Sequence, residues 1–226
     1  MKKTMIIMLV LIISLSLFTA CDTNLKAPAI TPETKQPVIT PGTNPPVSSN
    51  EYVKGSFTET EFASQYLDLK FILPEGFVMA TEEEMREMMG LGSEIMDLDS
   101  DLVEYAMLTT VYEMMALNID GSTNVIVFSE KLSLRNITVE QYFAVLKSQL
   151  QEIFGMECEI DDDIVSVEIA GCNYEQMTVS VSVNGVDILQ QYVLRKIDDR
   201  MVGFLTTTTH GEEDVLSTLM EGFSKY

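Results

Sequence analysis

The distribution of apolar and polar residues after about residue 50 predicts a domain rich in β-strands. Apolar and polar side chains alternate there, and a period of two places successive side chains on opposite faces of a sheet. The stretches that show this alternation include residues 57–62, 67–73, 111–117, 123–132, 174–183, 186–197 and 201–209. Turn residues separate several of them, and Asp120-Gly121 and Asn184-Gly185 are typical of tight hairpins.

The two stretches that flank Asn184-Gly185 also predict their own register. A two-residue loop opposes Val183 with Val186, Val181 with Ile188, Val179 with Gln190, and Met177 with Tyr192. This pairing collects apolar side chains on one face and leaves serine and threonine on the other. A slip by one residue would exchange the two faces, so we expect the register to be well fixed.

Apolar residues that recur with a period near 3.6 predict helices, and two of these begin at a capping box. Thr81 with Glu84, and Thr138 with Gln141, have the spacing of that motif. The helix after Thr81 presents on one side Met85, Met88 and Met89. The helix after Thr138 is expected to bury Val139, Tyr142, Phe143, Leu146, Leu150, Ile153 and Phe154. A last helix is expected to bury Val215, Leu216, Leu219, Met220 and Phe223.

Strands joined by hairpins, with helices inserted between them, predict an α+β fold. We expect an antiparallel sheet of about six to seven strands with helices covering it. The region 51–226 is one domain's worth of chain and is long enough to bury a substantial core.

Several of these segments also resemble a known fold. Leu73-Pro74-Glu75-Gly76-Phe77 follows a strand with the motif Leu-Pro-x-Gly-aromatic, and the helix after Thr138 contains Tyr-x-x-x-Leu-Lys. Together with Ile169-Ala170-Gly171 and the Gln190-Gln191-Tyr192 strand, these motifs resemble the PsbP-like fold over most of residues 55–226. The resemblance implies an α/β/α sandwich that docks on partners and is not catalytic, and it transfers no binding residue to this chain.

The N-terminus has the composition of a secretory signal peptide. Lys2 and Lys3 precede an apolar run from Met5 to Phe18, which is too short to cross ~30 Å of hydrocarbon comfortably. Leu17-Phe18-Thr19-Ala20-Cys21 then resembles the signal of bacterial lipoproteins, in which the cysteine is diacylated and becomes the new N-terminus. Two acyl chains are sufficient for stable membrane anchoring. Cys21 is therefore the expected site of lipid attachment.

A tether separates this cysteine from the domain. Six of the chain's seven prolines lie between residues 22 and 50, with few large apolar residues around them. Such a segment behaves as an extended spacer and could reach ~90 Å at ~3.1 Å per residue. The expected organisation is a lipoprotein signal peptide at 1–20, a lipidated cysteine and disordered tether at 21–50, and a single α+β domain at 51–226.

The charge of the chain limits the classes of partner that we expect. It contains 35 acidic and 14 basic residues, for a formal net charge of −21. No basic stripe is present to displace counterions, so nucleic acid is not an expected partner. The charge favours a solvated acidic surface and cationic partners.

The residues that usually carry metal or catalytic chemistry are sparse. His210 is the only histidine, which excludes a multi-histidine zinc site within one chain, and we expect it in the turn before the last helix. Asp97 to Asp101 imitates the first half of a calcium loop, but Leu102 and Leu108 stand where that loop needs Gly and Glu. We expect no metal site and no cofactor.

Cys158 and Cys172 are the two cysteines that remain after lipidation. Outside the cytoplasm they could form a disulfide, which would contribute ~3 kcal/mol, or they could stay as two apolar core thiols.

Methionines are concentrated between residues 85 and 115. Their flexible thioether side chains can fill a core, can line a surface that adapts to partners, or can bind Cu(I). Met85, Met88 and Met89 share one helix stripe and are the candidate partner surface.

These features lead to one leading functional hypothesis and one alternative. We expect a lipoprotein anchored on the extracytoplasmic face of the cell membrane, acting as a non-enzymatic binding or assembly module for a protein or peptide. The alternative is an extracytoplasmic hydrolase-like enzyme that uses carboxylates. Converging carboxylates with perturbed pKa values would favour the enzyme.

Overall fold

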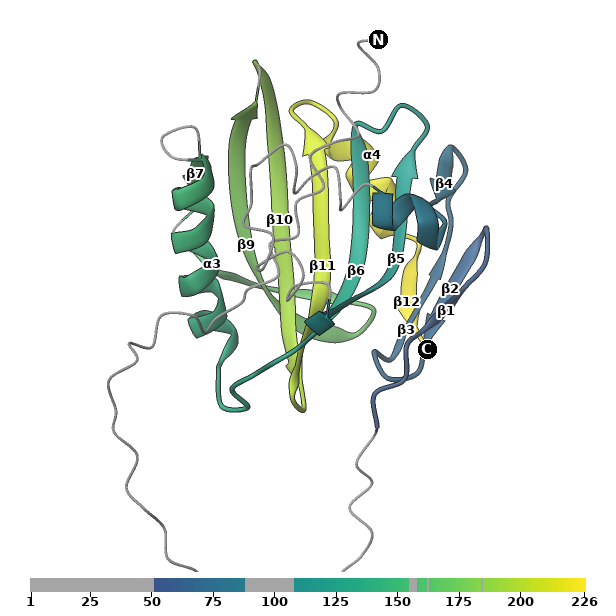
Figure 1. Cartoon of the computed structure of the whole chain (residues 1–226). Helices are drawn as coiled ribbons and strands as arrows, with labels where there is room; N and C mark the ends of the chain where they lie inside the picture. The colour runs from purple at the N-terminus through teal and green to yellow at the C-terminus, as the bar shows by residue number, and fades with distance from the viewer. Residues whose placement is uncertain (1–50, 88–107, 155–157, 162, 184) are drawn as a thin grey trace, which may run out of the picture.

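Two antiparallel sheets lie face to face, and a long helix covers the outer face of the larger sheet (Figure 1). The computed structural model describes residues 51–87, 108–154, 158–161, 163–183 and 185–226. Every strand pair in this part of the chain is antiparallel. The fold is therefore α+β with antiparallel sheets, as the sequence predicts.

The large sheet has eight strands, seven of which follow one another across it. Their order is β4 (Phe77–Met79), β5 (Thr110–Asn118), β6 (Thr123–Lys131), β11 (Arg200–Thr209), β10 (Val186–Ile197), β9 (Cys172–Val183) and β7 (Cys158–Ile160). The eighth strand, β8 (Val165–Ile169), also pairs with β9.

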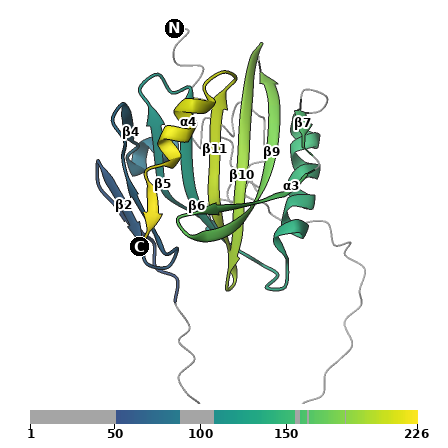
Figure 2. The same cartoon turned by 180° about the vertical axis from the view of Figure 1, so that it is seen from behind.

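The small sheet has four strands that come from the two ends of the domain. Their order is β1 (Ser56–Phe57), β2 (Glu61–Ser64), β3 (Leu69–Ile72) and β12 (Phe223–Lys225). Figure 2 shows this sheet and the helix α4 (Glu213–Met220) on the face of the large sheet that is opposite to α3 (Val139–Phe154).

Each face of the large sheet has its own apolar core. On one face, α3 buries Tyr142, Phe143, Leu146 and Leu150 against strand residues such as Met177 and Leu205. On the other face, an aromatic group joins the two sheets and includes Phe71, Phe204 and Phe223. The ring centroids of Phe71 and Phe223 are 4.5 Å apart, and those of Phe204 and Phe223 are 4.9 Å apart. Aromatic pairs at these distances add to the stability that burial provides.

The local predictions of helix starts and hairpins are confirmed. The Thr138 amide donates to Gln141 Oε1 at 3.0 Å, and the Gln141 amide donates back to Thr138 Oγ1 at 3.3 Å. Thr81 and Glu84 exchange the same pair of bonds at the start of a short helix over 82–87. Asp120-Gly121 lies in the turn between β5 and β6.

The predicted register of the β9–β10 hairpin is also confirmed. Val183 pairs with Val186 and Val181 with Ile188, and the pairing continues to Met177 opposite Tyr192. Val181 is 2% exposed and Ile188 is 8% exposed. Gly185 has a φ of 78°, which is the conformation that a type I′ turn requires, whereas Asn184 lies outside the described residues.

The number of strands was underestimated in the sequence analysis. The structure contains a four-stranded and an eight-stranded sheet, in place of one sheet of six to seven strands. One cause is the stretch 57–62, which is two short strands joined by a turn. The Thr58 hydroxyl accepts the amides of Thr60 at 3.3 Å and Glu61 at 3.1 Å and thereby bends the chain.

The position of Phe223 was also wrong in the sequence analysis. Helix α4 ends at Met220, and Phe223 belongs to β12, where it pairs with Phe71. Its side chain is buried as expected, but through a strand that fills the edge of the small sheet. Helical periodicity extends equally well to residue 223, so only the partner strand β3 decides this end of the chain.

None of the helices in the described ranges is long and apolar enough to cross a lipid bilayer.

Candidate functional site

The methionine surface suggested by the sequence is not supported at Met85. This side chain is 5% exposed and packs with Ala80, Met115 and Ile126. The side of the helix over 82–87 that carries Met85 faces inward, because β5 and β6 present apolar side chains to it. Met85 is therefore a core residue, and Met88 and Met89 lie outside the described residues.

The two candidate disulfide cysteines are free thiols on opposite sides of the large sheet. Cys158 packs against the α3 core and Cys172 against the aromatic core. Cys158 pairs with Val181, which is ~30 Å along β9 from Cys172 at ~3.3 Å per residue. A disulfide needs Cα atoms within roughly 7 Å, so these two cysteines cannot bridge in this fold. Burial raises the pKa of the Cys158 thiol, which disfavours its reactive thiolate.

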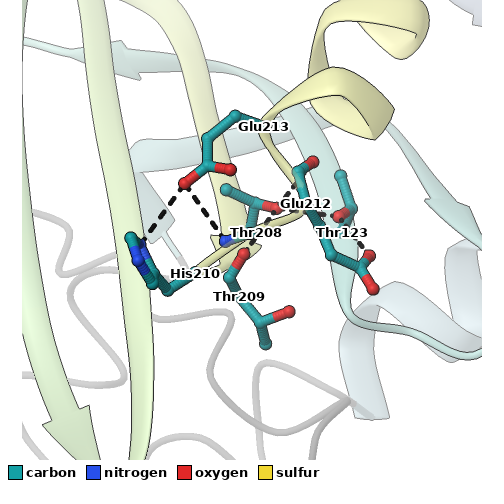
Figure 3. Close-up of polar contacts among 7 residues, drawn as sticks. Thr123, Thr208, Thr209, His210, Glu212 and Glu213 are labelled. Carbon is teal, nitrogen blue, oxygen red and sulfur yellow. Dashed lines mark hydrogen bonds and ion pairs between the residues drawn. The ribbon is translucent and has the colours of Figure 1, made fainter.

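His210 lies in the turn between β11 and α4, as expected (Figure 3). Its side chain is 84% exposed, and its Nδ1 is 3.4 Å from Glu213 Oε1. The same Oε1 accepts the Gly211 amide at 3.2 Å. The backbone amides of Glu213 and Gly211, and then His210, lower the pKa of the Glu213 carboxyl.

Hydroxyl groups, which include those of Thr123 and Thr208, form further hydrogen bonds around this turn (Figure 3). Ser122 Oγ donates to Glu212 Oε2 at 2.6 Å, and the hydroxyls of Thr123 and Thr208 are 2.9 Å apart. These contacts join the β5–β6 turn to the start of α4. Among the described residues, no hydroxyl or thiol is hydrogen-bonded to the His210 imidazole. The arrangement therefore stabilises the start of a helix.

A concave site in the described part of the chain lies between the two sheets, where an edge strand of each sheet faces the same groove. The groove has a volume of about 500 Å³. One wall is formed by residues 55–59, which contain β1, and the other by residues 79–82, which begin at the last residue of β4. Its volume lies within the range of small ligand and peptide sites.

The register of each edge strand determines which backbone groups face away from its sheet. The Thr58 amide donates to the Glu61 carbonyl at 2.8 Å, which makes Thr58 and Ser56 the residues bonded to β2. The amide and carbonyl of Phe57 therefore point away from β2. On β4, the Ala80 amide donates to the Met115 carbonyl at 2.9 Å, so the backbone groups of Met79 point away from β5 by the same rule. Phe57 and Met79 both line the groove.

A buried carboxylate fixes the wall that contains β1. Glu113 is 0% exposed and accepts the Tyr52 hydroxyl and the Gly55 amide, each at 2.7 Å. Arg200 stacks on the Tyr52 ring, with its Cζ 3.6 Å from the ring centroid, and donates to Ser129 Oγ at 2.8 Å. We call Tyr52, Gly55, Glu113 and Arg200 the clasp, because together they attach the first described residues to the large sheet.

The clasp is partly or fully buried, and burial shifts the pKa values of Glu113 and Tyr52. Loss of hydration raises the pKa of the Glu113 carboxyl, although its hydrogen bonds to Tyr52 and Gly55 partly oppose this. The same loss of hydration, together with the adjacent Glu113 carboxylate, raises the pKa of Tyr52. Both oxygens of Glu113 are engaged in holding the chain, so this carboxyl has a structural role.

Gly55 is required in the clasp by close packing. A Cβ atom at this position would lie 2.5 Å from Phe62 Cε2 and 3.0 Å from the Ala63 carbonyl oxygen. The absence of a side chain lets the strand approach β2 while its amide reaches Glu113.

Glu82, which lines the groove, forms an ion pair with Lys54. Lys54 Nζ is 2.6 Å from Glu82 Oε1, and this contact lowers the pKa of the Glu82 carboxyl. Both residues of the pair also line a smaller hollow of about 270 Å³, together with residues that include Met85, Arg86 and Tyr112. Thr110 also lines this hollow, and its buried hydroxyl has no hydrogen-bond partner in the part of the chain that the structure describes.

In the described ranges, no group of three or more His, Cys, Asp or Glu side chains is placed to hold a metal ion. The Asp97 to Asp101 segment, which imitates part of a calcium loop, lies outside those ranges.

The groove was not found from the sequence. Its walls come from short strands that the periodicity merged or extended, and their neighbours are distant in sequence. One signal was present, because Glu113 interrupts the otherwise largely apolar stretch 111–117. A carboxylate within a buried strand must find partners, which here are the backbone and tyrosine of the clasp.

Comparison with known proteins adds limited information. No protein-family model and no curated protein matches the sequence. Among solved structures, the chain is similar to cyanobacterial PsbP (CyanoP) from Synechocystis sp. PCC 6803, with 8% identity and a TM-score of 0.46 over 76% of this chain and 95% of that chain. It is also similar to LpqN of Mycobacterium tuberculosis, which is involved in cell envelope biogenesis, with 11% identity and a TM-score of 0.41 over 69% of this chain and 82% of that chain.

A third similar structure is a protein from Bacteroides thetaiotaomicron, with 10% identity and a TM-score of 0.41 over 75% of this chain and 49% of that chain. CyanoP is a PsbP protein, from the family that the sequence motifs resemble. At these TM-scores the likeness does not bear on the function of this chain.

Proposed function

We propose that this protein is a lipid-anchored, extracytoplasmic binding module that holds a segment of a protein or peptide partner in the groove between β1 and β4. The observation that carries the proposal is a pair of strand edges whose residues Phe57 and Met79 line one groove and direct their backbone groups away from their own sheets. Unpaired strand edges are templates for another chain, and compact proteins usually cover them.

The design of the groove supports binding. Its β1 wall is fixed by the buried Glu113 and by Arg200, both of which belong to the large sheet. A rigid wall reduces the entropy that is lost when a partner docks. The clasp begins at Tyr52, directly after the proposed tether, so the groove would be a fixed feature of the domain while the tether sets its reach.

The non-enzymatic part of the proposal rests on the state of the carboxylates. Glu113 is buried, has a raised pKa, and is bonded on both oxygens to the chain itself. A substrate could not reach it without opening the clasp. The hydrolase-like alternative would need carboxylates that converge on an accessible pocket.

The membrane anchor gives a direct prediction. Changing Cys21 to serine removes the thiol that would carry the acyl chains, and two chains are needed for stable attachment. The Cys21→Ser variant should move from the membrane fraction to the supernatant after cell lysis and salt washing. Persistence of the variant in washed membranes would show that something other than acylated Cys21 holds the protein.

Site-specific photocrosslinking in cells tests the binding role. A photoreactive amino acid at Glu59, in the exposed rim of the groove, should give a discrete adduct whose partner peptide is identified by mass spectrometry. The matched control is Glu168, which is exposed on β8, a strand that pairs with β9 and does not line the groove. Equal adducts at both positions, or none at Glu59, would contradict a binding role for the groove.

A further inference from the structure

The geometry points to one kind of occupant for the groove: we propose that an extended, basic segment of a partner protein binds there as an added β-strand. This inference rests on the proposed function and specifies the partner and its mode of binding.

The backbone arrangement selects an extended segment. Phe57 on β1 and Met79 on β4 direct their amide and carbonyl groups away from their own sheets, and both residues line the groove. No hydrogen bond joins these groups to another residue of the described chain. An extended peptide presents an amide and a carbonyl to one side at every second residue, which matches a strand edge. A helix has already satisfied these groups internally.

The side chains of the groove select alternate apolar residues in that segment. Phe57 and Met79 are half-buried, and Ala80 is 3% exposed. Phe57 packs against both the aromatic core and the cluster around Ala80 and Met85, so the floor of the groove is continuous with the interior. Successive side chains of a strand point to opposite faces, so every second side chain of the ligand would meet this floor.

The charge of the rim selects a basic segment. Glu59 lies on the β1 wall and Glu82 on the opposite wall, and both are exposed. Glu82 is paired with Lys54, whereas the Glu59 carboxylate forms no ion pair or hydrogen bond with the described chain. Lysine or arginine on the outward side of an added strand would compensate the Glu59 carboxylate.

The net charge of the whole chain disfavours a second copy of this chain as the occupant of the groove. Each copy carries a formal net charge of −21, so two copies repel one another. A basic partner is attracted by the same field, and its association should weaken as salt is added.

The test uses the full-length chain, purified in detergent, and a blocked peptide in which lysine alternates with valine. We expect the peptide to bind and to slow hydrogen exchange at the Met79 or Phe57 amide, measured by NMR. N-methylation of every second backbone amide of the peptide removes the N–H donors on one of its two edges. When this is the edge that faces the strand of the protein, binding should weaken roughly 10-fold or more. Methylation of the other alternate set should change the affinity much less.

Protein variants provide the matched controls. Glu59→Lys reverses a rim charge that has no structural contact, and should weaken the lysine–valine peptide roughly 10-fold. Glu168→Lys makes the same change on β8 and should leave the affinity unaltered. A peptide with glutamate in place of lysine should bind less tightly than the basic one.

The possible failures are distinguishable. If both methylated peptides bind as tightly as the parent, or if the acidic peptide binds better, the added basic strand is wrong while a binding role for the groove stands. If no peptide binds but Glu59 crosslinks a partner in cells, this inference also fails and the proposed function stands. If neither peptide binding nor crosslinking at Glu59 occurs, both are overturned.

Discussion

The Gly203→Ala variant is expected to lose roughly 3 kcal/mol or more of unfolding free energy, or to fail to fold. A Cβ atom at Gly203 would lie 2.0 Å from the Val193 carbonyl oxygen and 2.9 Å from Leu194 Cδ2. The first of these is backbone, which cannot rotate away as a side chain can. Strand β10 is paired with β9 on one side and β11 on the other, and both of its faces carry buried residues. The clash can be relieved only by separating strands in the centre of the sheet.

Gly211→Ala is the matched control for this prediction. Gly211 has a φ of 95°, and a Cβ there would have nothing within 4 Å. Its substitution should cost only the strain of a left-handed backbone, about 1 kcal/mol. Urea denaturation of both variants measures the difference. Equal losses for the two variants would show that the approach of β10 and β11 at Gly203 can relax, which this structure does not allow.

The Glu113→Ala variant is expected to lose about 2–4 kcal/mol and to release the β1 wall of the groove. The change removes a buried acceptor and leaves the Tyr52 hydroxyl and the Gly55 amide without their partner. It also leaves a cavity beneath the clasp. Urea denaturation should give the loss of stability, and hydrogen exchange should show faster opening of residues 52–58 than of α3. Tyr52→Phe is the milder control, since it removes the hydroxyl that donates to Glu113 but keeps the ring, at a cost of about 1 kcal/mol.

The clasp also predicts a pH dependence with a definite sign. Because burial raises the pKa of Glu113 in the folded state, the folded protein binds this proton more tightly than the unfolded chain does. The stabilising contribution is present below the ordinary glutamate pKa and is lost as the pH rises through the raised folded value. Glu113→Gln cannot titrate, so the stability of the wild type relative to this variant should increase as the pH falls from 7 towards 4. A difference that is constant over this range, or that decreases, would contradict the direction of the shift.

Sequence reasoning was most successful where the cause of a structure is local. The β9–β10 register follows from a two-residue loop and an alternating apolar face, both of which lie within residues 174–197. The Thr81 and Thr138 capping boxes each involve residues three positions apart, and each forms in the structure. His210 was placed correctly because a polar residue between a strand and a helix has few other positions. These features require no knowledge of distant partners.

The candidate site could not be predicted from the sequence because its residues are far apart along the chain. Glu113 meets Tyr52 and Gly55 across about sixty residues, and no spacing rule connects them. Met85 fitted an exposed stripe as well as a buried one, and only β5 and β6 beneath it decided that it is core. The two cysteines were compatible with a disulfide until the sheet separated them by the length of β9.

The sequence by itself determined the antiparallel character of the domain, its helix starts, its best hairpin and the apolar face of α3, because each depends on periodicity or on hydrogen bonds between near neighbours. The tertiary structure decided that there are two sheets, that Phe223 ends in a strand, and that β1 and β4 face one groove. Those outcomes depend on which surfaces find one another after the local elements form. Pairing between the two ends of the domain, as in β3 with β12, is stabilised by burial of shared apolar area, and this has no counterpart in any short stretch of the chain.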